Sequence, residues 1–170
     1  HERTQKDGTV TYWMTFNEIN MLMHLPFMGA GISIREGENE LQVKYQAAHN
    51  ELVASAMATK LAHEINPDFR IGCMLAAGQF YPYSCNPADV WDALSKDRNN
   101  YFFIDVQSRG AYPSYAKKFL ERNGIALEMG AEDERILREN TVDFIAFSYY
   151  ASRLTSADPN AGGLHGGKCH

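Results

Sequence analysis

Three short apolar segments, separated by long stretches of helix-forming sequence, constrain the fold of this chain more than any other feature. They cover residues 10–16, 70–76 and 142–150, and the first and third are rich in β-branched and aromatic side chains. Such segments predict β-strands, and strands that alternate with helices form parallel sheets through right-handed crossovers. The sequence therefore predicts an α/β fold whose three parallel strands lie side by side in sequence order.

The clearest helix lies between the first two strands. Apolar side chains and one histidine recur there at steps of three and four, which is the spacing of one helix face. The stripe comprises Tyr45, Ala48, His49, Leu52, Val53, Ala56, Met57, Leu61 and Ile65. His49 lies within this stripe, so we expect a histidine of the core and not a metal ligand.

Capping residues predict the remaining helices. Asn86 followed by Pro87 is typical of a helix start, and Val90 and Leu94 continue that helix. A further helix is expected from Ser114, as its cap, to Gly124, and a short acidic one over residues 132–140. Residues 21–37 and 78–85 are expected to be loops, and residues 156–170 a loop or tail.

The length of 170 residues suits a single domain, with a core over about residues 10–155. An eight-stranded parallel barrel requires about 200 residues at least. Three strands cannot close such a barrel. The chain therefore forms either a small open α/β sheet or a part of a larger fold.

Charge and cysteine content exclude several classes of function. The net charge of −5, without a basic stripe, argues against a nucleic-acid partner, and no apolar run is long enough to span a membrane. Cys73, Cys85 and Cys169 form no CxxC pair, which argues against a zinc site or a disulfide framework and favours a reducing cytoplasm. His165 and His170 near Cys169 are too few for a metal site.

Residues 12–20 carry the most specific motif, Tyr-Trp-Met-Thr-Phe-Asn-Glu-Ile-Asn. It resembles the signature at the end of the fourth barrel strand of family-1 glycoside hydrolases, where Pro more often stands in place of Ile19. Segments 81–87 and 143–150 also resemble that family, in its bacterial 6-phospho-β-glucosidase branch. The resemblance covers about residues 10–158.

The resemblance implies a fold, a site and a reaction. The fold would be a partial (β/α)8 TIM barrel spanning about strands four to six. Glu18 would be the general acid/base, Asn17 would bind the sugar 2-hydroxyl, and Tyr150 would contact the catalytic nucleophile. No metal or organic cofactor is implied. The family's nucleophile motif, Thr-Glu-Asn-Gly, does not occur in the sequence.

We therefore expect a fragment of a retaining enzyme that hydrolyses 6-phospho-β-glucosides and is inactive by itself. A 6-phospho-β-galactosidase or an unphosphorylated β-glucosidase of the same family is the nearest alternative. A non-catalytic sugar-binding or interaction module is the alternative from another class. The expected partner is a phosphorylated β-glucoside, and an opened barrel could also self-associate through its exposed strand edges.

Overall fold

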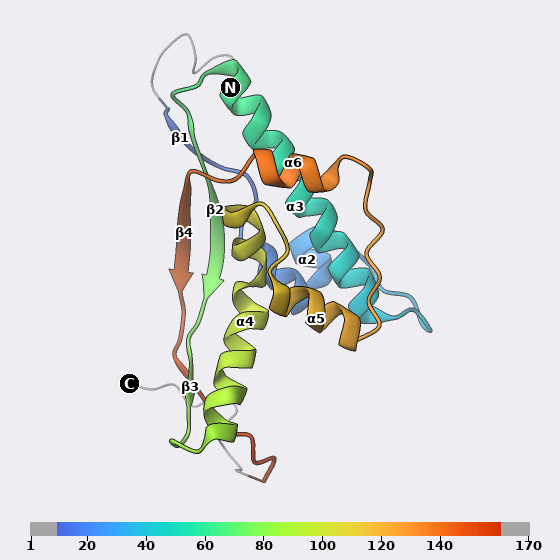
Figure 1. Cartoon of the computed structure of the whole chain (residues 1–170), viewed down its shortest axis with the longest axis vertical. Helices are drawn as coiled ribbons and strands as arrows, with labels where there is room; N and C mark the ends of the chain where they lie inside the picture. Colours follow the sequence, from blue (N-terminus) through green and yellow to red (C-terminus); the bar gives the residue numbers. More distant parts are fainter. Residues whose placement is uncertain (1–9, 161–170) are drawn as a thin grey trace.

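A computed structural model describes residues 10–160 and contains the expected parallel sheet (Figure 1). Its strands are β1 (Tyr12–Met14), β2 (Arg70–Ala77) and β4 (Phe144–Tyr149), in the order β1-β2-β4. Both pairings are parallel, with Met14 opposite Gly72 and Gly72 opposite Phe144. The α/β prediction is therefore confirmed, and the sheet stays open, as expected for part of a barrel.

The long helices cover one face of this sheet, as Figure 1 shows. The helices in chain order are the 3-10 helix η1 (Ile19–Met23), α2 (Pro26–Ala30), α3 (Glu40–Ile65), α4 (Pro87–Arg109), α5 (Ser114–Arg122) and α6 (Asp133–Glu139). The core lies between α3 and the second half of α4, where Leu52, Phe103 and Val106 are fully enclosed. The rings of Tyr45 and Phe102 meet edge to face there, 5.5 Å apart.

Two segments that we expected to be loops contain regular structure. η1 and α2 lie within or beside residues 21–37, and Pro26 occupies the first turn of α2. Strand β3 (Phe80–Pro82) lies within 78–85 and pairs in parallel with β5 (Arg153–Thr155). Strands of three residues are too short to produce a recognisable alternation of side chains, which explains why the sequence did not reveal them.

The apolar stripe predicted on α3 is correct except at two positions. Met57 and Leu61 are more than half exposed, whereas Ala56 is buried and Ile65 packs against Ile71 and Phe69. The buried face also includes Ser55 and Thr59, which are polar. Their hydroxyl groups are satisfied, because Ser55 bonds Thr15 and Thr59 donates to the Ser55 carbonyl. Hydrogen bonding thus lets small polar residues occupy core positions that a hydrophobicity pattern assigns to apolar ones.

Helix ends follow the predicted chemistry at two of three positions. The Asn86 side chain caps α4 by accepting from the amide of Ala88. Gly124 adopts a left-handed backbone just after α5, as expected. Ser114 is not a cap, because it is the first residue of α5 and Pro113 precedes it as the N-cap. Val90 and Leu94 lie on α4, as predicted, and both are exposed.

His49 is a core residue, as predicted, and it joins three elements. Its Nδ1 lies 2.8 Å from the Tyr112 hydroxyl and its Nε2 lies 3.0 Å from the Asp133 carboxylate. A carboxylate can only accept, so Nε2 carries a proton and donates to Asp133, and in the neutral imidazole Nδ1 would accept from Tyr112. Burial opposes ionisation of Asp133, but hydrogen bonds from His49 and the Gly130 amide outweigh it and hold the pKa of Asp133 below its usual range.

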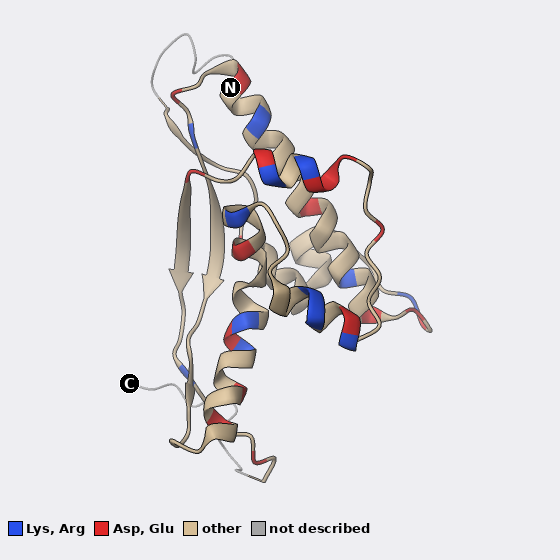
Figure 2. Ribbon diagram, in the orientation of Figure 1, with Lys and Arg blue, Asp and Glu red and all other residues tan. Residues whose placement is uncertain are grey.

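Exposed apolar side chains lie on both faces of the open sheet in the described part of the chain. Tyr12 and Met14 share one face with Gly72 and Phe144, whereas Ile145, Phe147 and Tyr149 share the other face with Cys73, Leu75 and Ala77. The helices cover this second face over β2 but leave it open over β4, where Ile145, Phe147 and Tyr149 are 45% to 63% exposed and form the exposed β4 patch. Acidic and basic residues lie mainly on the helices and loops (Figure 2), and the exposed β4 patch contains none.

Two sequence-based expectations concern other parts of the molecule. No helix within residues 10–160 is long and apolar enough to cross a membrane. His165, Cys169 and His170, which we judged too few for a metal site, lie outside the described residues.

We expect His49→Phe to lower the free energy of unfolding by about 2–4 kcal/mol, because it leaves Tyr112 and Asp133 without their partner. Urea unfolding measures the change, and His63→Phe is the control. His63 also bonds a carboxylate, that of Asp143, but it is more exposed, so a loss below about 1 kcal/mol is expected.

Acid should weaken the contact between His49 and Asp133. The folded state holds the pKa of Asp133 below its unfolded value, so this contribution is complete above about pH 4 and is lost as the pH falls through the folded pKa. The destabilisation by His49→Phe should shrink over that range. If the difference in free energy of unfolding between the unmodified chain and His49→Phe stays constant from neutral to strongly acidic pH, the ionised Asp133 does not stabilise this contact.

We propose that the chain self-associates through the exposed β4 patch, because exposed apolar patches and open strand edges favour association. Phe147→Lys should then shift the chain towards monomer in sedimentation velocity over a range of concentrations. Tyr83→Lys is the matched control, since Tyr83 is an aromatic of similar exposure that lies off the sheet. A monomer at every concentration, or equal effects of both substitutions, would contradict the proposal.

Candidate active site

Glu18 follows directly on the first strand, where the chain leaves the sheet. The Thr15 amide still donates to Gly72, and the Glu18 amide donates to the Met74 carbonyl at 3.1 Å. Glu18 has φ 52° and ψ 55°, and it is the only residue other than glycine with positive φ within residues 10–160. A left-handed backbone costs an L-residue about 1–2 kcal/mol, and such strain is concentrated at functional sites.

The side chain of Asn20 fixes the turn that contains Glu18. Its Oδ1 accepts from the Ala76 amide at 3.1 Å, and its Nδ2 donates to the Ala76 carbonyl at 2.9 Å. The same Nδ2 also donates to Asn100 on α4. The amide of Asn20 thus imitates a neighbouring strand and ties η1 to the end of β2, a role that the sequence did not suggest.

The carboxyl group of Glu18 points to the end of the third strand of the sheet. Glu18 is only 8% exposed, and the Tyr150 hydroxyl donates to its Oε1 at 2.7 Å. Tyr150 reaches this position because its own amide donates to the Ala77 carbonyl. Glu18 and Tyr150 therefore meet beside Ala76 and Ala77 at the end of β2, although Tyr150 itself stays largely exposed.

Glu18 lines two cavities. The first, of about 390 Å³, contains Tyr150, Ala77, His24 and Arg153 as well. The second, of about 380 Å³, contains Asn17 and Glu51. The three predicted site residues therefore meet only through Glu18, because Asn17 and Tyr150 line different cavities.

Glu51 is a residue of this region that sequence reasoning missed. Its Oε2 is buried and has no hydrogen-bond partner among the described residues, and burial raises the pKa of the carboxyl. The sequence signal was weak, since one glutamate on a long helix is usually solvated. Its place beside Glu18 follows from the fold alone.

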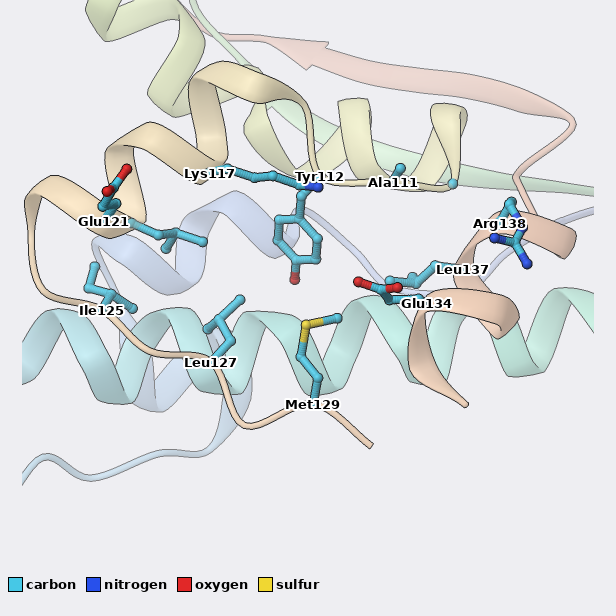
Figure 3. Close-up of a pocket in the computed structure, with 12 residues that line it drawn as sticks. Ala111, Tyr112, Lys117, Glu121, Ile125, Leu127, Met129, Glu134, Leu137 and Arg138 are labelled. Carbon is cyan, nitrogen blue, oxygen red and sulfur yellow. The ribbon is translucent and has the colours of Figure 1, made fainter. Parts of the chain in front are cut away.

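A third cavity, of about 450 Å³, lies away from Glu18 between α5, α6 and the segment that joins them (Figure 3). Its walls are largely apolar, with Leu127, Met129 and Leu137 among them. Tyr112 also lines it, and its hydroxyl points towards α3. None of the three predicted site residues lines this cavity.

Replacing Glu18 by glycine and by alanine should measure the backbone strain. Both changes remove the carboxyl group and its bond to Tyr150, but only glycine relieves the left-handed backbone. We expect Glu18→Gly to be about 1 kcal/mol more stable to urea than Glu18→Ala. At Lys60, an exposed position inside α3, the order should reverse, because glycine destabilises helix interiors. The same order at both positions would contradict the assigned strain.

Comparison with known proteins agrees with this geometry. Residues 4–165 match the model of glycosyl hydrolase family 1. The chain is 61% identical over 155 residues to a 6-phospho-beta-glucosidase of Escherichia coli, covering 91% of this chain and 32% of that protein. It is 52% identical over 158 residues to an aryl-phospho-beta-D-glucosidase of Bacillus subtilis, covering 93% and 34%.

A solved structure gives the same result for the fold. The family 1 β-glucosidase of Thermotoga maritima matches with a TM-score of 0.72 and 25% identity, over 93% of this chain and 36% of that one. The chain thus spans about a third of the length of the relatives that it matches. Its three parallel strands are part of the barrel of these enzymes. The chain belongs to glycosyl hydrolase family 1.

Proposed function

We propose that this chain supplies the general acid/base side of an active site that hydrolyses 6-phospho-β-glucosides with retention of configuration. The observation that carries the proposal is the placement of Glu18, buried at the carboxyl edge of the sheet and hydrogen-bonded by Tyr150. Barrel enzymes place their chemistry at this edge. The names of the two bacterial relatives favour a phosphorylated glucoside as the substrate.

The family implies roles for Glu18 and Asn17, and the positions of these side chains suit those roles. Glu18 would protonate the departing glycosidic oxygen and then deprotonate the incoming water. Asn17 is exposed at the neighbouring cavity, where its amide could bind the sugar 2-hydroxyl. Tyr150 was expected to contact the nucleophile, but here it donates to Glu18 and would hold that carboxyl in one orientation.

Retention requires a second carboxylate about 5–5.5 Å from the acid/base. The sequence contains no Thr-Glu-Asn-Gly motif to provide it. Glu51 is a poor substitute, because its burial opposes the anionic form that a nucleophile needs. We therefore propose that these residues alone do not turn over glucosides and that the segments completing the barrel supply the nucleophile.

The compartment and the cofactor requirement also belong to the proposal. Within the described residues Cys73 and Cys85 are free thiols, which suits the reducing cytoplasm. The acid/base chemistry assigned to Glu18 involves no metal or organic cofactor.

A chimera tests the proposal. Residues 10–160 would replace the matching stretch of the Escherichia coli relative, and hydrolysis of 4-nitrophenyl β-glucoside 6-phosphate and cellobiose 6-phosphate would be measured. We expect turnover of both by the chimera and none by the chain alone. Glu18→Gln in the chimera should lower kcat by about 10²–10⁴-fold, the usual contribution of acid/base catalysis.

The two substrates make this test specific. 4-Nitrophenolate departs easily without protonation, whereas a sugar alkoxide does not. The loss of kcat/KM in Glu18→Gln should therefore be larger for cellobiose 6-phosphate. Glu38→Gln, on an exposed loop, is the control and should leave both rates unchanged. A folded chimera whose rates do not depend on Glu18 would refute the assignment, and sugar binding without turnover would favour the non-catalytic module.

A further inference from the structure

Contacts with residues 78–80 fix the position of Arg153. It lies opposite Phe80 in the small β3–β5 sheet, and its amide donates to the Gln79 carbonyl at 2.8 Å. Its guanidinium lies over the Phe80 ring, with Cζ 5.3 Å from the ring centre. Gly78 makes room for it, because a Cβ at that position would lie 3.0 Å from Nη1.

The charge of Arg153 is not neutralised within residues 10–160. No ion pair between described residues includes Arg153, whereas Arg109 and Arg135 each pair with acidic residues on their own helices. Asp97, on the adjacent part of α4, uses its carboxylate oxygens on the Phe80 amide and the Gln79 side chain. The guanidinium therefore keeps donors available for a ligand.

Arg153 lies where two cavities adjoin. One is the cavity of about 390 Å³ that contains Glu18 and Tyr150, and the other, of about 560 Å³, lies between η1, α3, α4 and β3. Four residues line both cavities: Asn20, His24, Asn100 and Arg153. The second cavity adds Lys44 and Lys96, but these pair with Glu40 and Asp92. Arg153 is therefore the cation of this space without an acidic partner among the described residues, and its guanidinium is the group that would attract an anion.

We propose that Arg153 forms a subsite for an oxyanion, a carboxylate or a phosphate, carried on the leaving-group side of the glycoside. This inference rests on the proposed function, since Glu18 would protonate the leaving-group oxygen and Arg153 shares its cavity. Asn17, the proposed contact of the sugar 2-hydroxyl, lines the cavity without Arg153. A planar guanidinium stacked on an aromatic ring presents two parallel donors, which match both oxyanions.

The test uses the full chain and measures binding by NMR titration. The probes are 4-hydroxybenzoate and phenyl phosphate as anionic leaving-group mimics, 4-hydroxybenzyl alcohol as a neutral mimic of similar shape, and glucose 6-phosphate. We expect both anionic mimics to bind more tightly than the alcohol. Arg153→Gln should weaken them about fivefold to tenfold, as expected for losing a charge-assisted hydrogen bond, and should leave the alcohol unchanged.

Three variants separate a built subsite from general electrostatic attraction. Arg35→Gln removes an equal charge from an exposed loop and should leave the affinities unchanged. Arg153→Lys keeps the charge but loses the planar fork, so its affinities should lie between those of the unmodified chain and Arg153→Gln. Gly78→Ala keeps every charge and should also weaken the anions, because its methyl group displaces the guanidinium. Melting curves confirm that each variant is folded.

Two outcomes would overturn the subsite. Equal losses of anion affinity in Arg35→Gln and Arg153→Gln would show that the anions respond to net charge and not to a built subsite. Binding of glucose 6-phosphate through Arg153 in preference to both leaving-group mimics would move the anion to the sugar side. If the chimera does not hydrolyse its substrates but Arg153→Gln still weakens anion binding, the proposed function is wrong and the anion site remains. The two proposals can therefore fail separately.

Discussion

The backbone of strand β2 determines where Glu18, Asn20 and Tyr150 lie. Its Met74 carbonyl accepts from the Glu18 amide, both backbone groups of Ala76 bind the Asn20 side chain, and its Ala77 carbonyl accepts from Tyr150. Because β1, β2 and β4 are parallel, the chain leaves all three strands at one edge. Backbone amides and carbonyls at the end of β2, which would otherwise lack hydrogen-bond partners, thereby position functional side chains.

Where local chemistry determines structure, the sequence was a reliable guide. The apolar segments gave the three strands of the main sheet, and Asn86 followed by Pro87 gave the start of α4. The motif around Glu18 placed this glutamate after the first strand of the sheet, and Tyr150 lies after the last one, although its partner is Glu18 and not the expected nucleophile. These features depend on a few neighbouring residues or on a motif whose geometry is set by the fold.

Features that depend on tertiary contact escaped prediction. Ser55 and Thr59 are buried only because Thr15 and the helix backbone satisfy their hydroxyls. Glu51 shares a cavity with Glu18 because α3 packs against η1 and Ser55 bonds Thr15. Arg153 shares the other cavity of Glu18 because β5 pairs with β3. Asn20 is similarly invisible in sequence, since its partners are 56 and 80 residues away. No local pattern records such long-range pairs.

The left-handed backbone at Glu18 has a consequence for how this position changes over generations. Glycine would suit the backbone better, so selection for stability alone would tend to remove the glutamate. A residue that persists against its own conformational preference reports selection for chemistry. Once that chemistry is no longer needed, position 18 should be among the first to drift, and glycine is the replacement that the fold would accept most readily.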